Sequence, residues 1–193
     1  MPDSLYQRVL QLGDRYTPTF MHSLFPQFYD AREMHTAGEK ALRDKDFKLA
    51  ATFFSRATRL APDNPNGWAM YGRALFALDR KVEALNAFLV EEQLRPDGAA
   101  ASYDLAQVLS SEGRFEEALE YAKKATELKG YSTESWLSMV CYIGRQAIKF
   151  NRQEVREEVM GVLRERFPLI GHTDIFVRGF SRDAVATAIL FNR

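Results

Sequence analysis

The chain has 193 residues with 26 basic and 26 acidic side chains, so its formal net charge is zero. A balanced surface disfavours broad electrostatic capture of nucleic acid or of an anionic membrane. No apolar run approaches the roughly 20 residues that a bilayer-spanning helix needs, and residues 1–16 lack the apolar core of a signal peptide. We therefore expect a soluble, cytoplasmic protein with no nucleic-acid partner and no membrane partner.

Cysteine and histidine usage argues against a metal site, a cofactor and an enzyme. The single Cys141 cannot form an internal disulfide, and the three histidines share no ligand-like spacing. The sequence contains neither a phosphate-binding loop nor a nucleophile motif. We therefore expect no metal, no cofactor and no catalytic activity.

Residues 1–30 form the first segment of the chain. Residues 4–16 are typical of an amphipathic helix with Ser4 as its N-cap, and an aromatic-rich stretch follows at 17–30. We predict an N-terminal helical arm or cap. The alternative is a surface for a partner or for a second copy of the chain, which would make a homodimer.

Residues 31–132 contain an internal repeat with a period of 34 residues. Four columns of similar residues keep this spacing, which chance does not explain. The columns are Gly38, Gly72 and Ala106; Ala50, Ala84 and Ala118; Leu60, Leu94 and Leu128; and Pro62, Pro96 and Gly130. The pattern predicts three repeats, at 31–64, 65–98 and 99–132.

Each repeat is predicted to be a pair of helices. In the second unit Trp68 and Leu75 recur at helical spacing, and Pro96 ends a second helical run after a polar corner. The small residues Gly72 and Ala84 allow the two helices to approach closely. Because one helix pair cannot bury its own apolar face, we expect the units to stack into an all-α solenoid.

The pattern weakens after the third unit. At 133–166 the apolar residues of a first helix persist, but Arg152 and Arg156 stand where the second helix should carry a small and an aromatic residue. We expect a degenerate fourth helix pair with altered packing. Residues 167–193 are predicted to be a C-terminal segment with a capping helix. The alternative is a tail that occupies the binding groove.

The repeat resembles the tetratricopeptide repeat (TPR). The signature residues of that family are matched in the second unit by Trp68, Tyr71, Gly72, Leu75, Ala84, Phe88, Glu91 and Pro96. The first and third units follow the same pattern, with Gly130 in place of proline in the third. The resemblance implies a TPR-type α-solenoid with capping helices at both ends, in which the first helices line a concave groove.

The resemblance also implies which side chains line this groove, because the family places them at fixed positions of the first helices. The ones able to hold a partner are Arg32, His35, Glu39, Arg43, Asn66, Arg73, Phe76, Tyr103, Gln107, Leu137 and Arg145. The four arginines favour an acidic partner, and the aromatic and apolar side chains would hold anchor residues of a peptide. We expect a peptide or helix of a partner protein to bind there.

One TPR subclass does not fit. The members that hold the C-terminal carboxylate of heat-shock chaperones use basic and amide side chains, whereas the matching positions here include Glu39 and Asp104. Acidic side chains repel a carboxylate rather than bind it.

The sequence therefore predicts an interaction adaptor or scaffold. Two alternatives stay open. One is a cytoplasmic secretion-type chaperone that holds a client protein, an analogy that rests on size and layout alone. The other is a self-assembling scaffold that pairs through the N-terminal arm.

Glu91 departs from the repeat pattern, since Ala57 and Ala125 occupy the same position in the neighbouring units. A buried carboxylate needs compensation. We expect it from Arg95, four residues further along the same helix, or from the hydroxyl group of Tyr103.

Overall fold

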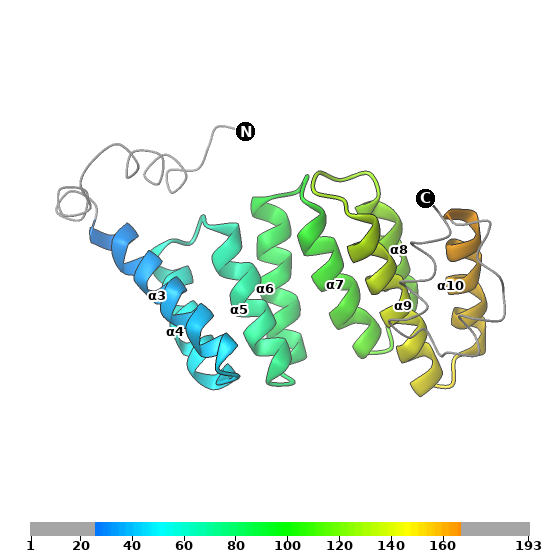
Figure 1. The fold of residues 1–193 in the computed structure, drawn as a ribbon, viewed down its shortest axis with the longest axis horizontal. Helices are drawn as coiled ribbons and strands as arrows, with labels where there is room; N and C mark the ends of the chain where they lie inside the picture. The colour runs from blue at the N-terminus through cyan, green and yellow to red at the C-terminus, as the bar shows by residue number, and fades with distance from the viewer. Residues whose placement is uncertain (1–25, 167–193) are drawn as a thin grey trace. The chain divides into compact units, whose positions relative to one another are not determined.

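A computed structural model describes residues 26–166 of the chain, and these residues form helices and no β-strand. The all-α prediction is therefore confirmed. The helices are α3 (Pro26–Arg43), α4 (Phe47–Leu60), α5 (Pro65–Ala77), α6 (Lys81–Leu94), α7 (Ala99–Ser111), α8 (Phe115–Ala125), α9 (Thr133–Lys149) and α10 (Gln153–Arg166), in the order that Figure 1 shows. The terminal helices predicted at 4–16 and within 167–193 lie outside the described residues.

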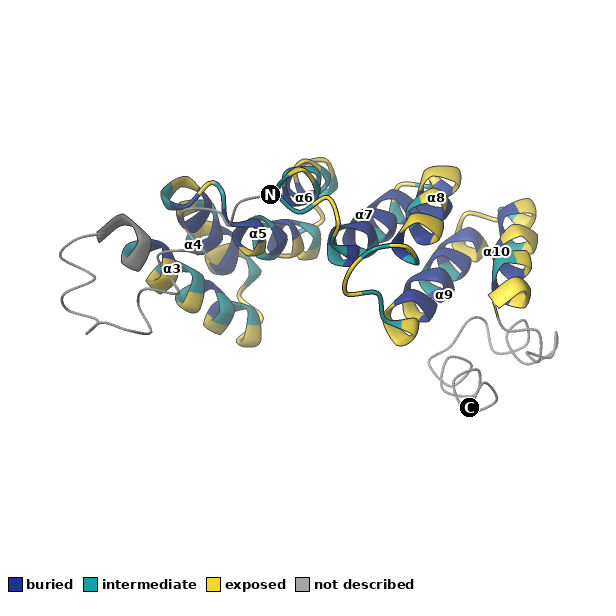
Figure 2. Cartoon of the chain, turned by 90° about the horizontal axis from the view of Figure 1, so that it is seen from above, coloured by how far each residue is buried: buried dark blue, intermediate teal, exposed yellow. Residues whose placement is uncertain are grey.

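The chain divides into two compact units, one that ends at Pro96 and one that begins at Asp97. The first unit contains α3 to α6, and the second contains α7 to α10. Within each unit the buried residues lie on the sides of the helices that face one another, and the exposed residues lie on the outer sides (Figure 2). This distribution is the one expected of stacked amphipathic helices.

In the first unit, each second helix places a phenylalanine ring against a glycine of the first helix. Phe54 of α4 and Phe88 of α6 are both buried. A Cβ atom at Gly38 would lie 2.8 Å from the Phe54 ring, and one at Gly72 would lie 2.5 Å from the Phe88 ring. Glycine therefore recurs at this position of the repeat because a phenylalanine ring packs directly against the backbone of the first helix.

The second unit is packed differently, because Ala106 and Ala122 stand where the first unit has the glycine and the ring. Trp136 of α9 is buried, and its indole N–H donates a hydrogen bond of 2.8 Å to the carbonyl oxygen of Ala122. Ala122 lies in the last turn of α8, where carbonyl groups lack a partner within their own helix. The indole therefore ties the start of α9 to the end of α8.

A residue in the left-handed region of φ precedes each second helix. These residues are Lys45, Asp79, Gly113 and Asn151, with φ of 60°, 60°, 78° and 54°. The first three of these residues are spaced 34 residues apart along the chain, but Gly113 and Asn151 are 38 residues apart. The fourth corner therefore comes about one helical turn late.

The extra turn belongs to α9, which has 17 residues where α7 has 13. Because α10 begins at Gln153, Arg152 lies in the corner and not in the helix. Counted from the start of the second helix of each pair, the eighth residue is Phe54 in α4 and Met160 in α10. Met160 is fully buried. The prediction that Arg156 takes the aromatic position was wrong, because the 34-residue period does not account for the added turn.

Glu91 is buried, with 1% of its surface exposed. The two side chains that we expected to compensate it have other partners. Arg95 donates a hydrogen bond of 2.8 Å to the side-chain oxygen of Asn66, and the Tyr103 hydroxyl group bonds to Ser132.

Replacing Gly72 with alanine should destabilise the protein by about 1–3 kcal/mol, because the added methyl group must displace the Phe88 ring. Gly161→Ala is the matched control, since Gly161 is also helical and a Cβ atom there meets nothing within 4 Å. We expect this control to be stabilising by about 0.5–1 kcal/mol. Urea unfolding followed by circular dichroism measures both, and two effects of the same sign would contradict the ring-on-glycine packing.

Candidate functional site

The first helices of the second unit, α7 and α9, enclose a groove with a volume of about 290 Å³. The residues that line this α7–α9 groove are Tyr103, Asp104 and Gln107 from α7, and Ser135, Ser138, Met139, Tyr142 and Arg145 from α9. Three of the predicted groove residues, Tyr103, Gln107 and Arg145, thus come together here. The sequence reasoning did not predict the other five as groove residues.

Leu137 is not part of the groove, although the family resemblance placed it there. It is fully buried in the core, with 0% of its surface exposed, and Cys141 and Gly144 on the same side of α9 are also buried. The face of α9 toward the groove runs instead through Ser135, Ser138 and Tyr142, one residue further along. One residue is about 100° of helix rotation, so α9 is turned relative to the family pattern.

Tyr103 fixes one end of the groove. Its hydroxyl group accepts a hydrogen bond from the backbone N–H of Ser132 at 3.1 Å and donates to the carbonyl oxygen of Ser132 at 3.4 Å. Ser132 is also the N-cap of α9, with its side chain accepting from the N–H of Ser135. Burial raises the pKa of Tyr103 above its ordinary value. The side chain therefore stays protonated and holds the start of α9 beside α7.

The groove is polar and carries one charge of each sign. Asp104 is 8% exposed, and the guanidinium group of Arg145 lies 5.7 Å from the centre of the Tyr142 ring. Contacts of this kind hold an arginine over an aromatic face. With Gln107 and two serine hydroxyl groups nearby, the groove offers donors and acceptors suited to a peptide backbone.

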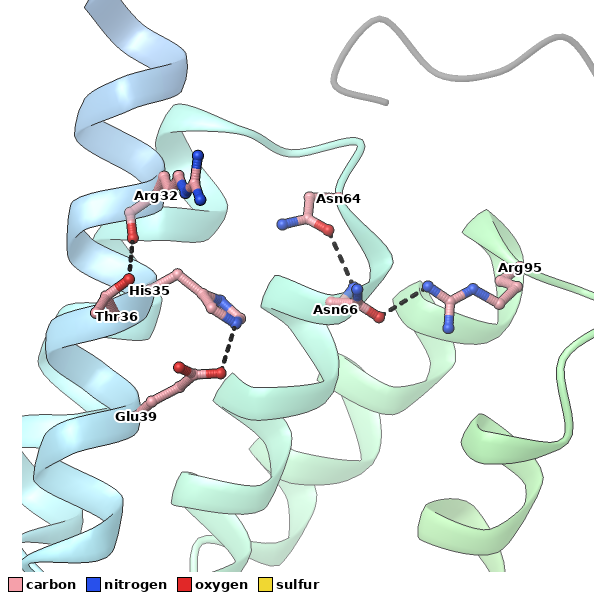
Figure 3. A network of polar contacts seen from close by, with 7 residues as sticks. All are labelled: Arg32, His35, Thr36, Glu39, Asn64, Asn66 and Arg95. Atoms are coloured by element: carbon pink, nitrogen blue, oxygen red, sulfur yellow. Dashed lines mark hydrogen bonds and ion pairs between the residues drawn. The ribbon is translucent and has the colours of Figure 1, made fainter. Parts of the chain in front are cut away.

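In the first unit, His35 and Glu39 point from α3 toward α5 (Figure 3). His35 Nε2 lies 3.5 Å from a carboxylate oxygen of Glu39, and the imidazole meets the Phe54 ring edge-on at 5.4 Å. Burial lowers the pKa of His35 below its ordinary value of 6.5, and the neighbouring Glu39 opposes this shift without cancelling it. His35 is therefore harder to protonate than a solvent-exposed histidine.

The other predicted residues of the first unit have different surroundings. Asn66, at the start of α5, accepts the hydrogen bond from Arg95 and so links α5 to the end of α6 (Figure 3). Arg32, Arg43 and Arg73 are exposed, and Phe76 is half-buried. The first-helix surface of this unit therefore presents three exposed arginines, with the His35 and Glu39 pair beside them.

The described residues offer little for catalysis or for metal binding. Burial raises the pKa of the Cys141 thiol to about 12, and a neutral buried thiol is a poor nucleophile. In residues 26–166 no group of histidine, cysteine and acidic side chains could hold a metal ion. No helix in this range is long and apolar enough to cross a membrane.

The sequence matches the tetratricopeptide repeat family over residues 35–96 and 82–133. The two matches together span residues 35–133, which are 99 of the 193 residues. Among curated proteins, the CTR9 homolog of Arabidopsis thaliana is 29% identical over 86 residues. That stretch is 45% of this chain, but the chain spans only 8% of the relative's length.

Solved structures of low sequence identity share the fold. YrrB, described as a TPR protein with an unusual peptide-binding site, has a TM-score of 0.58 at 16% identity, over 97% of this chain and 98% of its own. The TPR2B domain of yeast Sti1, solved in complex with an Hsp70 peptide, has a TM-score of 0.50 at 14% identity, over 69% and 98%. These structures establish the solenoid architecture.

Lowering the pH from 7 to 5 should destabilise the wild type more than a His35→Gln variant. The folded state holds His35 with a lowered pKa, so the unfolded chain takes up the proton first, and stability falls as the pH drops below about 6.5. Urea unfolding at both pH values gives the difference between the two proteins. An NMR titration in which His35 titrates at or above 6.5 would contradict the argument.

Tyr103→Phe should lower the stability by about 1 kcal/mol, because it removes the hydroxyl group that bonds to Ser132 but keeps the ring. Tyr71→Phe is the control, since the Tyr71 hydroxyl group makes no hydrogen bond with any described residue. We expect it to be neutral in the same urea titration. Equal stability of Tyr103→Phe and wild type would show that the contact with Ser132 is not formed in solution.

Proposed function

This chain belongs to the tetratricopeptide repeat family, and we propose that it is a non-catalytic adaptor or scaffold that binds a peptide or helix of a partner protein on its first helices. The family and its structural neighbours support a protein-interaction repeat domain. The observation that carries the finer proposal is the α7–α9 groove, which is concave and polar and contains aromatic side chains.

The size of the groove sets what it can hold. About 290 Å³ is at the lower end of the range for ligand pockets. A groove of this size suits one or two anchor side chains of a longer segment. The ring of Tyr142 offers an apolar surface for such an anchor, while Gln107 and Ser138 can bond to its backbone.

Charge supports an acidic partner. Arg32, Arg43 and Arg73 are exposed on the first helices of the first unit, and Arg145 lines the α7–α9 groove. Guanidinium groups form paired hydrogen bonds with carboxylates, which gives direction as well as attraction. Asp104 restricts this preference within the groove, so acidic residues of the partner should lie nearer to Arg145.

The structural neighbours and two acidic side chains indicate which class of ligand the chain binds. The Sti1 domain binds an Hsp70 peptide, and YrrB is described as having a peptide-binding site, which supports a peptide as the ligand class. Glu39 and Asp104 argue against a chaperone C-terminal carboxylate as the ligand here. The cytoplasmic location, the lack of nucleic-acid and membrane partners, and pairing through the N-terminal arm remain expectations from the sequence.

Photo-crosslinking from the groove tests the proposal. A benzoylphenylalanine placed at Ser138, which is exposed in the groove, should capture one partner protein through a defined segment. The matched control carries the same group at Glu120, which is exposed on the second helix α8. We expect the control position to capture little of that partner.

A second variant makes the test specific to the groove. Gln107→Ala combined with Arg145→Ala removes two side chains that line it, and should weaken capture from Ser138 about tenfold with helical content unchanged. Equal capture from both positions, or capture that the double variant does not weaken, would count against the groove. Capture of a second copy of this chain would favour the self-assembling scaffold.

A further inference from the structure

A second pocket lies on a different surface of the first unit, where α4 meets α5 and the corner before α6. This α4 pocket has a volume of about 590 Å³. The side chains that matter for its chemistry are Lys48, Thr52, Ser55 and Arg59 from α4, Tyr71 from α5, and Arg80 from the corner. None of the predicted groove residues lines it, so it is separate from the predicted groove.

The α4 pocket is basic. Its lining contains three cationic side chains and no acidic one. The Nε–H group and one terminal N–H group of Arg80 donate to the two carboxylate oxygens of Glu83, at 2.7 and 2.6 Å, and this ion pair offsets the charge of Arg80. Neither Lys48 nor Arg59 forms an ion pair with any described residue, and Arg59 uses only its Nε–H, toward the carbonyl oxygen of Ser55 at 3.3 Å. Two cations are therefore available to a ligand.

The two available cations lie at opposite ends of the pocket. Lys48 and Arg59 are eleven positions apart on α4, which is about 16 Å along the helix axis. The hydroxyl-bearing side chains of Thr52 and Ser55 lie between them on the same face. An extended peptide rises about 3.3 Å per residue, so roughly five residues span the same distance.

We propose that the α4 pocket is a second binding site, for an extended acidic segment of a partner protein with two acidic side chains about five residues apart. One carboxylate pairs with Lys48 and the other with Arg59. The hydroxyl groups of Thr52, Ser55 and Tyr71 contact the backbone between them. This site does not depend on binding at the α7–α9 groove.

The geometry disfavours other anionic ligands. A single phosphate group is much smaller than the roughly 16 Å of helix that separates the positions of Lys48 and Arg59, so an extended ligand suits this pair of cations better. A nucleic-acid strand carries a charge about every 3.4 Å, and the middle of the pocket offers it hydroxyl groups but no available cation. A peptide with acids at its two ends and a neutral centre matches the arrangement of charge.

The test uses the full chain and a labelled hexapeptide with glutamate at both ends and serine and glycine between them. Fluorescence anisotropy at low ionic strength should show saturable binding at up to millimolar peptide. Amide NMR shifts should change along α4 and at the end of α5. Lys48→Gln combined with Arg59→Gln should weaken binding about tenfold, and both side chains are exposed, so the fold is kept.

The matched control removes the same charge elsewhere. Lys40→Gln combined with Arg56→Gln replaces an exposed base on α3 and another on a different side of α4, and should leave the affinity unchanged. A peptide with the two glutamates side by side should bind more weakly than the spaced one. No saturable binding, equal loss in the control variant, equal affinity of the two peptides, or shifts confined to α3 and the α7–α9 groove would each overturn the proposal.

Discussion

The packing of a phenylalanine ring on a glycine is the contact on which the first unit depends. Gly38 with Phe54, and Gly72 with Phe88, bring the two helices of a hairpin so close that a methyl group does not fit between them. Interiors are packed to nearly crystalline density, so such a contact leaves little freedom in the spacing of the helices. The distance between the two helices therefore determines the positions of the side chains on the outer surfaces of this unit.

Close packing inside the hairpins leaves the first unit with two chemically different outer surfaces. Most apolar side chains are buried between the helices, and most exposed side chains on the first-helix and second-helix sides are polar. In the first unit, the first helices present exposed arginines beside the His35 and Glu39 pair. The second-helix side carries a pocket whose free charges are both positive. The α4 pocket and the first-helix surface of this unit therefore differ in both position and chemistry.

The sequence was sufficient for the helices and their order, because a 34-residue period with glycine and proline at fixed places has few other physical explanations. It was insufficient for the fourth pair. Leu137 was assigned to the groove from the family's positions, but α9 is rotated by about one residue and buries it. A period records spacing along the chain and not the rotation of a helix about its axis. The available signal was the recurrence of polar residues at helical spacing, at Ser135, Ser138 and Tyr142.

The α4 pocket was missed for a different reason. The family resemblance places ligand-binding residues on the first helices and so predicts nothing about side chains of the second helices. The signal was nevertheless present in the sequence. Lys48, Thr52, Ser55 and Arg59 recur at spacings of four, three and four, which places them on one helix face. A polar stripe on a helix whose other face is apolar is ordinary, and the neighbouring Tyr71, Leu78 and Arg80 complete the pocket.

The longer α9 shows why the repeat tolerates one irregularity. Four added residues rotate a helix by about 400°, which is one full turn and about 40° more. Because the excess is small, an insertion of this size keeps roughly the same side of the helix toward the core, whereas two added residues would turn the apolar side outward. Phe150 then packs edge-on against Phe115 at 5.6 Å, and Met160 fills the position of the aromatic ring in α10. The added turn therefore changes where the hairpin ends while its core is kept.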